Sequence, residues 1–187
     1  MKRFLVWLCA LMMIGGGCAE ELMAFTGSGY ERIAVVHPAE GYALAGVETD
    51  PSDPALQYFR YAPEAPGSMQ FYTVQRSMGD AKIMAEQYVR NILQYVSALE
   101  LSGATEHAVN GNPAYSVVSA YHLKTASGDT AYVQNVLLYV ECPAENTCVV
   151  LNGINAGADE TAFGDSEQML KTLLSAAEMI EIEQEAE

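Results

Sequence analysis

Apolar residues recur along this chain with two different periods, and the change between them separates strands from helices. In the first half they alternate or form short runs bounded by Pro, Gly and Asp, which is typical of strands. This pattern predicts strands at residues 31–36, 42–48, 56–61 and 69–76. Residues 49–54, Thr-Asp-Pro-Ser-Asp-Pro, are expected to form a loop because of their Pro and Asp content.

Two segments carry the 3.6-residue period of an amphipathic helix. The first is residues 80–99, with Ser77 or Asp80 as its cap. Its apolar side chains share one face: Met84, Tyr88, Ile92, Val96 and Leu99. The second is residues 165–180, and its apolar face consists of Met169, Leu173, Ala177 and Ile180.

Sequence patterns typical of strands return between the two helices. Strands are predicted at residues 104–109, 113–123, 130–141 and 149–154, with a tight turn at Asn110-Gly111. We therefore predict one α+β domain over residues 31–180. Its antiparallel β-sheet packs against both helices, on one face or on opposite faces. Residues 20–30 are expected to be a tether, and the acidic tail 181–187 is expected to fray.

The first 19 residues read as an export signal. Lys2 and Arg3 precede an apolar run at residues 4–14, which is too short to span a bilayer. Three glycines follow, and Gly17 and Ala19 provide the small residues of a cleavage site after Ala19. In the alternative reading Cys18 is the lipidated cysteine of a bacterial lipoprotein, although Gly15 stands where a lipobox usually has Leu. Both readings place the domain outside the cytoplasm, secreted or lipid-anchored.

The chain is strongly acidic, with a formal net charge of -15. Loss of Lys2 and Arg3 with the signal would take it to -17. Such a surface repels phosphate, so nucleic acid is excluded as a natural partner. It also repels anionic headgroups, so membrane attachment is expected only through a lipid anchor at Cys18.

Two cysteines, Cys142 and Cys148, remain outside the signal. Strand-like runs flank them, so they are expected to face each other across a hairpin and form a disulfide in an oxidising compartment. A thiolate metal site lacks further ligands nearby in the sequence.

Two segments of the sequence resemble the PsbP-like family, which also includes a Ran-binding nuclear import factor. The first is Ile33-x-Val35-x-x-Pro38-x-x-Gly41-Tyr42, and the second is Val109-x-Gly111-x-Pro113-Ala114-Tyr115. The resemblance covers residues 30–180 and implies an α/β/α sandwich around an antiparallel sheet. It further implies a non-catalytic binding or assembly module. Bacterial members of the family are often exported lipoproteins, which agrees with residues 1–19 here. The family offers no catalytic set to carry over, and its metal ligands match no motif here.

Candidate catalytic residues are sparse. The histidines are His37, His107 and His122, without zinc-site spacing, although His107 and His122 could approach across a hairpin. No G-x-S-x-G elbow and no phosphate-binding loop is present. Paired carboxylates could still meet in the fold, so a small extracellular hydrolase remains the alternative function.

Two acidic loops could suit calcium, although neither matches an EF-hand loop. They contain Glu48, Asp50 and Asp53, and Asp159, Glu160 and Asp165. Solvated turns and helix caps explain these acids more simply. No cofactor is expected.

Aromatic residues gather at residues 58–72. On a strand pair alternate residues face opposite sides, so some of them could be exposed and bind a glycan or a protein. The candidates are Tyr58, Tyr61, Phe71 and Tyr72. The favoured function is thus an exported, non-catalytic binding module of the cell envelope or extracellular space.

Overall fold

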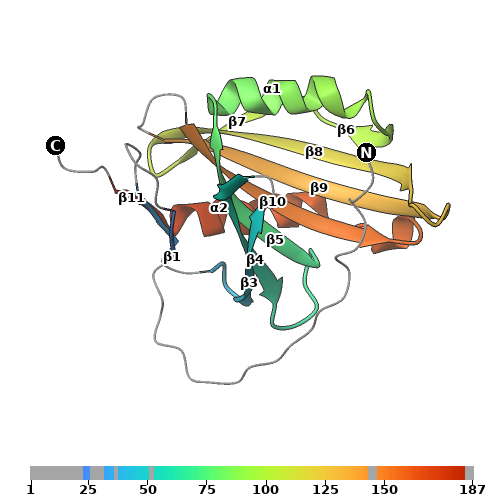
Figure 1. Ribbon diagram of the computed structural model, residues 1–187, viewed down its shortest axis with the longest axis horizontal. Coiled ribbons are helices and arrows are strands. Elements are labelled where there is room, and N and C mark those ends of the chain that lie inside the picture. Colours follow the sequence, from blue (N-terminus) through green and yellow to red (C-terminus); the bar gives the residue numbers. More distant parts are fainter. Residues whose placement is uncertain (1–22, 26–31, 36–37, 51–52, 143–146, 184–187) are drawn as a thin grey trace.

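The computed structural model describes residues 23–25, 32–35, 38–50, 53–142 and 147–183 (Figure 1). Its centre is an eight-stranded sheet in the order β3-β4-β5-β10-β9-β8-β6, with β7 also pairing with β8. All its pairs are antiparallel. The strands are β3 (Tyr42–Asp50), β4 (Asp53–Pro63), β5 (Phe71–Met78), β6 (Ser97–Leu101), β7 (Thr105–Val109), β8 (Asn112–Lys124), β9 (Thr130–Glu141) and β10 (Thr147–Gly157).

The sheet consists of two halves that are each continuous in sequence. One half is β3, β4 and β5, and the other runs from β6 to β10. They meet along a single ladder, in which Leu151 of β10 lies opposite Val74 of β5. The expected loop at residues 49–54 is shorter than predicted, because β3 and β4 stay paired as far as Asp50 and Asp53.

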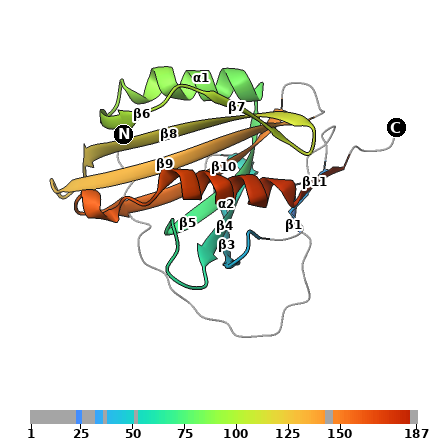
Figure 2. The ribbon, with the colours of Figure 1, turned by 180° about the vertical axis from the view of Figure 1, so that it is seen from behind.

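The two helices, α1 (Ala81–Ile92) and α2 (Ser166–Glu178), cover opposite faces of the sheet (Figures 1 and 2). Neighbouring residues of a strand point to opposite faces, so the sheet separates two cores. Leu138 and Leu151 pack with Met169 and Leu173 of α2. Leu137 and Val150 pack with Ala81 and Ala85 of α1. The predicted fold class, an antiparallel sheet with two packed helices in an α/β/α sandwich, is confirmed.

Helix α1 begins where the sequence predicts but ends earlier. Asp80 caps it by accepting a hydrogen bond from the backbone N–H of Ile83, and the carboxylate of Glu141 accepts another from that of Ala81. The predicted helix continued to Leu99, whereas the chain turns after Ile92 and enters β6. Pairing with β8 satisfies the hydrogen-bonding groups of the β6 backbone, so tertiary structure overrides the helix that the spacing of apolar residues predicts.

A second, three-stranded sheet has the order β1-β2-β11. Its strands are β1 (Met23–Phe25), β2 (Arg32–Val35) and β11 (Ile180–Glu183). Two predictions are therefore wrong in part: β1 lies inside the expected tether, and the start of the acidic tail is paired instead of frayed. Backbone pairing with β2 orders Ile180–Glu183 despite its two acidic side chains. None of the described helices is long and apolar enough to span a membrane.

Candidate binding face

Strand register divides the four candidate aromatic residues between the two faces of the sheet. Tyr61 pairs with Tyr72, and both lie on the α2 face within the core that contains Met169. Tyr58 pairs with Gln75 on the other face, the face that α1 covers further along the sheet. Phe71 lies on that same face, because it is two residues from Thr73 on β5. Tyr58 and Phe71 are half-buried.

The prediction that Tyr61 and Tyr72 could bind a ligand is wrong. Their side chains are 2% and 1% exposed, and their rings stack with centroids 4.8 Å apart. Burial raises the pKa of Tyr61 to about 12 and also raises the pKa of Tyr72. Both residues are structural because the α2 face of β4 and β5 is the interior of the larger core.

On the α1 face, the part of the sheet formed by β4, β5 and β10 carries a group of polar side chains. Arg60, Thr73 and Asn152 are consecutive partners across the three strands. Gln75 and the two aromatic residues flank this row. We call these six half-buried residues the open face: Tyr58, Arg60, Phe71, Thr73, Gln75 and Asn152.

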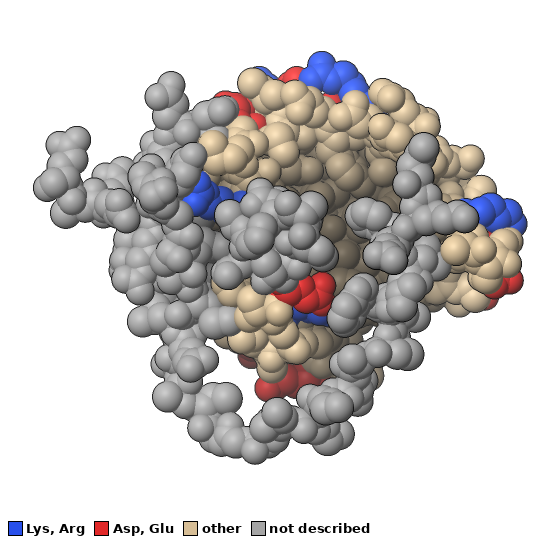
Figure 3. Space-filling view, in the orientation of Figure 1, with Lys and Arg blue, Asp and Glu red and all other residues tan. Residues whose placement is uncertain are grey.

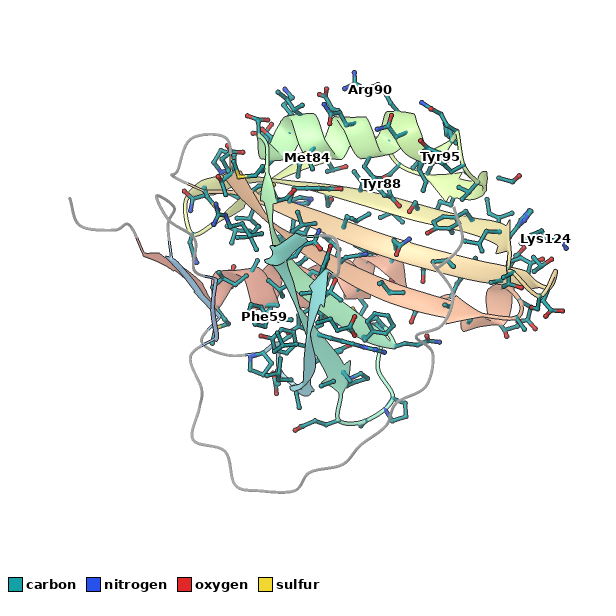
Figure 4. The ribbon with its side chains drawn as sticks, viewed as in Figure 1. Phe59, Met84, Tyr88, Arg90, Tyr95 and Lys124 are labelled. Carbon is teal, nitrogen blue, oxygen red and sulfur yellow. The ribbon has the colours of Figure 1, made fainter. Side chains whose placement is uncertain are left out.

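Helix α1 lies over β8 and β9 and leaves the strands of the other half of the sheet without a described helix on this side (Figures 1 and 4). Met84 and Tyr88 point from α1 towards the sheet, and Arg90 points away from it (Figure 4). In the visible surface below α1, charged side chains are sparse and the surface is hollowed (Figure 3).

Arg60 is held in place by two contacts. The carbon of its guanidinium lies 4.1 Å from the centroid of the Phe71 ring, a distance at which cation–π attraction operates. Its Nη1 lies 3.7 Å from Oε1 of Glu48 on β3, which is an ion pair at the limit of direct contact. The Arg60 side chain remains 40% exposed, so water screens that pair.

Two polar atoms of the open face are buried without a hydrogen-bond partner. They are Nε of Arg60, a donor, and Oδ1 of Asn152, an acceptor. Among the described side chains the third such atom is Oγ1 of Thr147. A buried polar group without a partner costs about 1–3 kcal/mol, so two of them in one cross-strand row require an explanation.

A satisfied polar cluster lies beside the open face, under α1. The hydroxyl of Tyr88 lies 2.8 Å from Oγ of Ser119. The amide of Asn135 donates to the hydroxyl of Tyr121 (3.0 Å). Burial raises the pKa of both tyrosines. Because these groups pair with one another, they position α1 on the sheet and leave the unpaired atoms of the open face as the distinct feature.

The structure keeps the histidines apart. His107 pairs with Ala114 at one end of β8 and lies 2.8 Å from Oγ of Ser116. His122 lies eight residues further along β8, against the ring of Tyr132 (5.8 Å). At about 3.3 Å per residue the two are about 26 Å apart, so the expected approach is wrong. His37 and Cys18 lie outside the described residues.

The predicted disulfide between Cys142 and Cys148 is also wrong. Cys148 lies opposite Glu141, and the backbone N–H of Cys142 donates to the carbonyl of Thr147. This register places the two side chains on opposite faces, where Cys142 joins the α2 core and Cys148 joins the α1 core. Both are buried thiols, and burial raises the pKa of Cys148 to about 12.

The acidic loops act mainly as caps. Asp165 accepts from the backbone N–H groups at the start of α2, and Asp159 accepts from Thr161 at a short 3₁₀ turn, Glu160–Ala162. Glu48 contacts Arg60. The side chains of Asp50 and Asp53 lie outside the described ones. Within the described part of the chain, no group of three or more His, Cys, Asp or Glu side chains could hold a metal ion.

Sequence reasoning missed Arg60 and Asn152. Arg60 stands between Tyr58 and Tyr61 in a strand whose aromatic residues dominated the pattern. Its alternation with Tyr58 was the available signal, since residues two apart on a strand share a face. Asn152 carries no such signal, because its position opposite Thr73 depends on pairing between strands more than 70 residues apart.

Comparison with known proteins gives matches only among solved structures. No family model and no curated protein matches the chain. One similar structure is the cyanobacterial PsbP (CyanoP) of Synechocystis sp. PCC 6803, with a TM-score of 0.48, 12% identity, and coverage of 92% of this chain and 98% of that chain. Another is LpqN, involved in cell envelope biogenesis of Mycobacterium tuberculosis, with a TM-score of 0.40, 14% identity, and coverage of 88% and 91%. The α/β/α arrangement that the sequence resemblance implies is the one that α1, the sheet and α2 form.

Proposed function

We propose that this protein is an exported, non-catalytic binding module of the cell envelope or extracellular space, and that the open face is its binding surface. The observation that carries the proposal is the cross-strand row of half-buried polar side chains, Arg60, Thr73 and Asn152, flanked by two half-buried aromatic residues. Binding sites are commonly concave surfaces with a few polar groups placed to fix the orientation of a ligand.

The rigidity of the surroundings supports this assignment. The open face is built on three central strands, and a core with fully buried Phe59, Tyr72 and Val74 lies directly beneath it. Side chains on such strands keep their positions better than side chains on loops. Arg60 is also pre-positioned by Phe71 and Glu48, so less entropy is lost when a ligand binds.

Export is supported by the sequence of residues 1–19, with its basic start, short apolar run and small residues before the cleavage point. A reporter fused after residue 25 should leave the cytoplasm. Cys18→Ala should abolish incorporation of labelled lipid if the lipoprotein form is correct. A mature N-terminus at Glu20 would instead establish the secreted form, and retention of the reporter in the cytoplasm would refute both.

The binding surface can be tested by retention on isolated cell-envelope material from the producing organism. We expect Arg60→Ala and Asn152→Ala to reduce retention. Arg76→Ala provides a matched control, because Arg76 lies on the same strand pair but pairs with Val149, on the α2 face. Equal retention of all variants, with unchanged melting temperatures, would exclude the open face as the binding surface.

A further inference from the structure

We propose that Asn110 is a site of spontaneous deamidation, and that this modification removes a side-chain cap from the C-terminal end of α2. The sequence contains two Asn-Gly pairs, Asn110-Gly111 and Asn152-Gly153. The fold exposes the first pair and encloses the second. Neither the modification nor its effect depends on the open face being a binding surface.

Deamidation of an asparagine takes place within the chain and needs water as its one co-reactant. The backbone nitrogen of the next residue attacks Cγ of the side chain and closes a five-membered ring. Nδ2 leaves as ammonia, taking the proton that the backbone nitrogen loses. Water then opens the ring: cleavage between the nitrogen and Cγ gives aspartate, whereas cleavage between the nitrogen and the main-chain carbonyl carbon gives isoaspartate. Glycine favours the attack most as the next residue, because it has no Cβ in the way.

The exposed pair leaves the attacking nitrogen accessible. Asn110 and Gly111 form the turn between β7 and β8, with φ values of 50° and 82°. The last ladder pair before the turn is Val109 with Asn112, so the N–H of Gly111 takes no part in the ladder. Asn110 and Gly111 are both exposed, so water can reach the ring once it has formed.

The second pair is protected by the centre of the sheet. Gly153 of β10 pairs with Tyr72 on one side and with Val136 on the other, so its N–H belongs to a ladder. Gly153 is buried, and a Cβ at its position would lie 2.8 Å from Sδ of Met69. Oδ1 of Asn152 is buried as well. Ring closure at this pair therefore requires a local opening of the central strands.

The side-chain amide of Asn110 bonds to the end of α2. Its Nδ2 donates a hydrogen bond of 3.0 Å to the main-chain carbonyl of Glu178, the last residue of this helix. The last carbonyls of a helix have no partner within it and form the negative end of its dipole. Deamidation replaces the donor with a carboxylate, which only accepts hydrogen bonds and is repelled by this end of α2. Isoaspartate also lengthens the backbone of a two-residue turn by one atom. Both products thus loosen the β7–β8 turn from α2.

Peptide mapping by mass spectrometry tests the site. The purified full chain is kept for several days at pH 8 and 37 °C, in native buffer and in guanidinium chloride, and each asparagine is followed for a mass gain of about 1 Da. Both Asn-Gly pairs should react at comparable rates in the unfolded chain. In the native protein Asn110 should react about tenfold faster than Asn152 or more, since the reaction of Asn152 waits for the sheet to open. Equal native rates, or an Asn110 that reacts only in the unfolded chain, would overturn the proposed site.

Thermal melting of two variants tests the effect on α2. Asn110→Asp introduces the carboxylate of the product, and it should lower the melting temperature by about 2–4 °C at pH 7. Gln87→Glu is the matched control, because it adds the same charge at an exposed position within α1 and should leave the melting temperature nearly unchanged. High salt should reduce the difference between the two variants, since part of it is electrostatic. Equal melting temperatures of Asn110→Asp and Gln87→Glu would overturn the loss of the cap.

Discussion

The ring of Tyr72 stacks on the ring of Tyr61, and its hydroxyl accepts a hydrogen bond from the backbone N–H of Ala39 at 3.0 Å. This bond ties the segment before β3 to the core. Tyr72→Phe keeps the stacked ring but leaves the buried N–H of Ala39 without an acceptor. We expect a loss of about 1–3 kcal/mol in the free energy of unfolding, measured by urea denaturation.

Tyr95→Phe is the matched control for this substitution, because Tyr95 is 81% exposed and its hydroxyl is free to bond with water. It should change the free energy of unfolding by less than about 0.5 kcal/mol. Equal stability of Tyr72→Phe and wild type would show that the hydroxyl of Tyr72 makes no net contribution.

Stability should fall in alkaline solution. Burial raises the pKa of Tyr61 and of Cys148 to about 12, from ordinary values of 10.0 and 9.0. Between pH 9 and pH 12 the unfolded chain releases these protons while the folded chain retains them, so the free energy of unfolding decreases as pH rises. Tyr72 and Tyr139, whose pKa values are also raised by burial, add to the effect.

Urea denaturation at a series of pH values between 8 and 12 measures this dependence. Tyr61→Phe removes one of the titrating groups, so its stability should decline less steeply above pH 10. A stability that is flat to pH 12 would contradict the burial of these groups.

Gly164 should tolerate no side chain. A Cβ at this position would overlap the carbonyl oxygen of Ser68 and lie 2.8 Å from Nδ2 of Asn155. Gly164 also exchanges two hydrogen bonds with the amide of Gln134, at 2.8 and 3.0 Å. Gly164→Ala must therefore move backbone and break this network, and we expect a loss of about 2–4 kcal/mol.

Gly103→Ala serves as the comparison, because a Cβ at Gly103 meets no atom within 4 Å. Its melting temperature should remain close to that of wild type. A Gly164→Ala variant that melts at the same temperature as Gly103→Ala would show that residues 158–165 do not rest on Ser68 as the structure describes.

The cysteines should behave as two protected thiols. Cys142 and Cys148 are buried on opposite faces, so a bond between them would require the β9–β10 pairing to shift by one residue. Since the thiolate is the reactive form, the raised pKa of Cys148 further slows its alkylation. Iodoacetamide at pH 8 should label the native protein slowly and the urea-unfolded protein fast. Mass spectrometry that shows a loss of two hydrogens would instead establish a disulfide.

The sequence predicts those features that depend on neighbouring residues. Local chemistry explains the helix caps Asp80 and Asp165. It also explains the turn at Asn110-Gly111, where Asn110 has φ 50° and Gly111 has φ 82°. Local chemistry does not explain where α1 ends, because Val96 and Leu99 keep the helical spacing while their segment pairs with β8 in the sheet.

The candidate site depends on register, which local patterns do not determine. Alternation predicts that Tyr58 and Tyr61 face opposite sides of β4, but the packing of α2 decides which side is the interior. Cys142 and Cys148 illustrate the same limit: a shift of one residue decides between facing sulfurs and sulfurs on opposite faces. Arg60 and Asn152 lie in one cross-strand row, on either side of Thr73, only because β5 pairs with β10.

That single ladder between β5 and β10 also has a kinetic consequence. Residues 71–78 can join the second half of the sheet only after residues 147–157 have been synthesised. Contacts so distant in sequence close slowly, because the entropy of a long loop must be lost before any of them forms. The α2 core closes later still, since it needs the last helix of the chain. The complete sheet and its α2 core therefore form only when nearly the whole chain has been made.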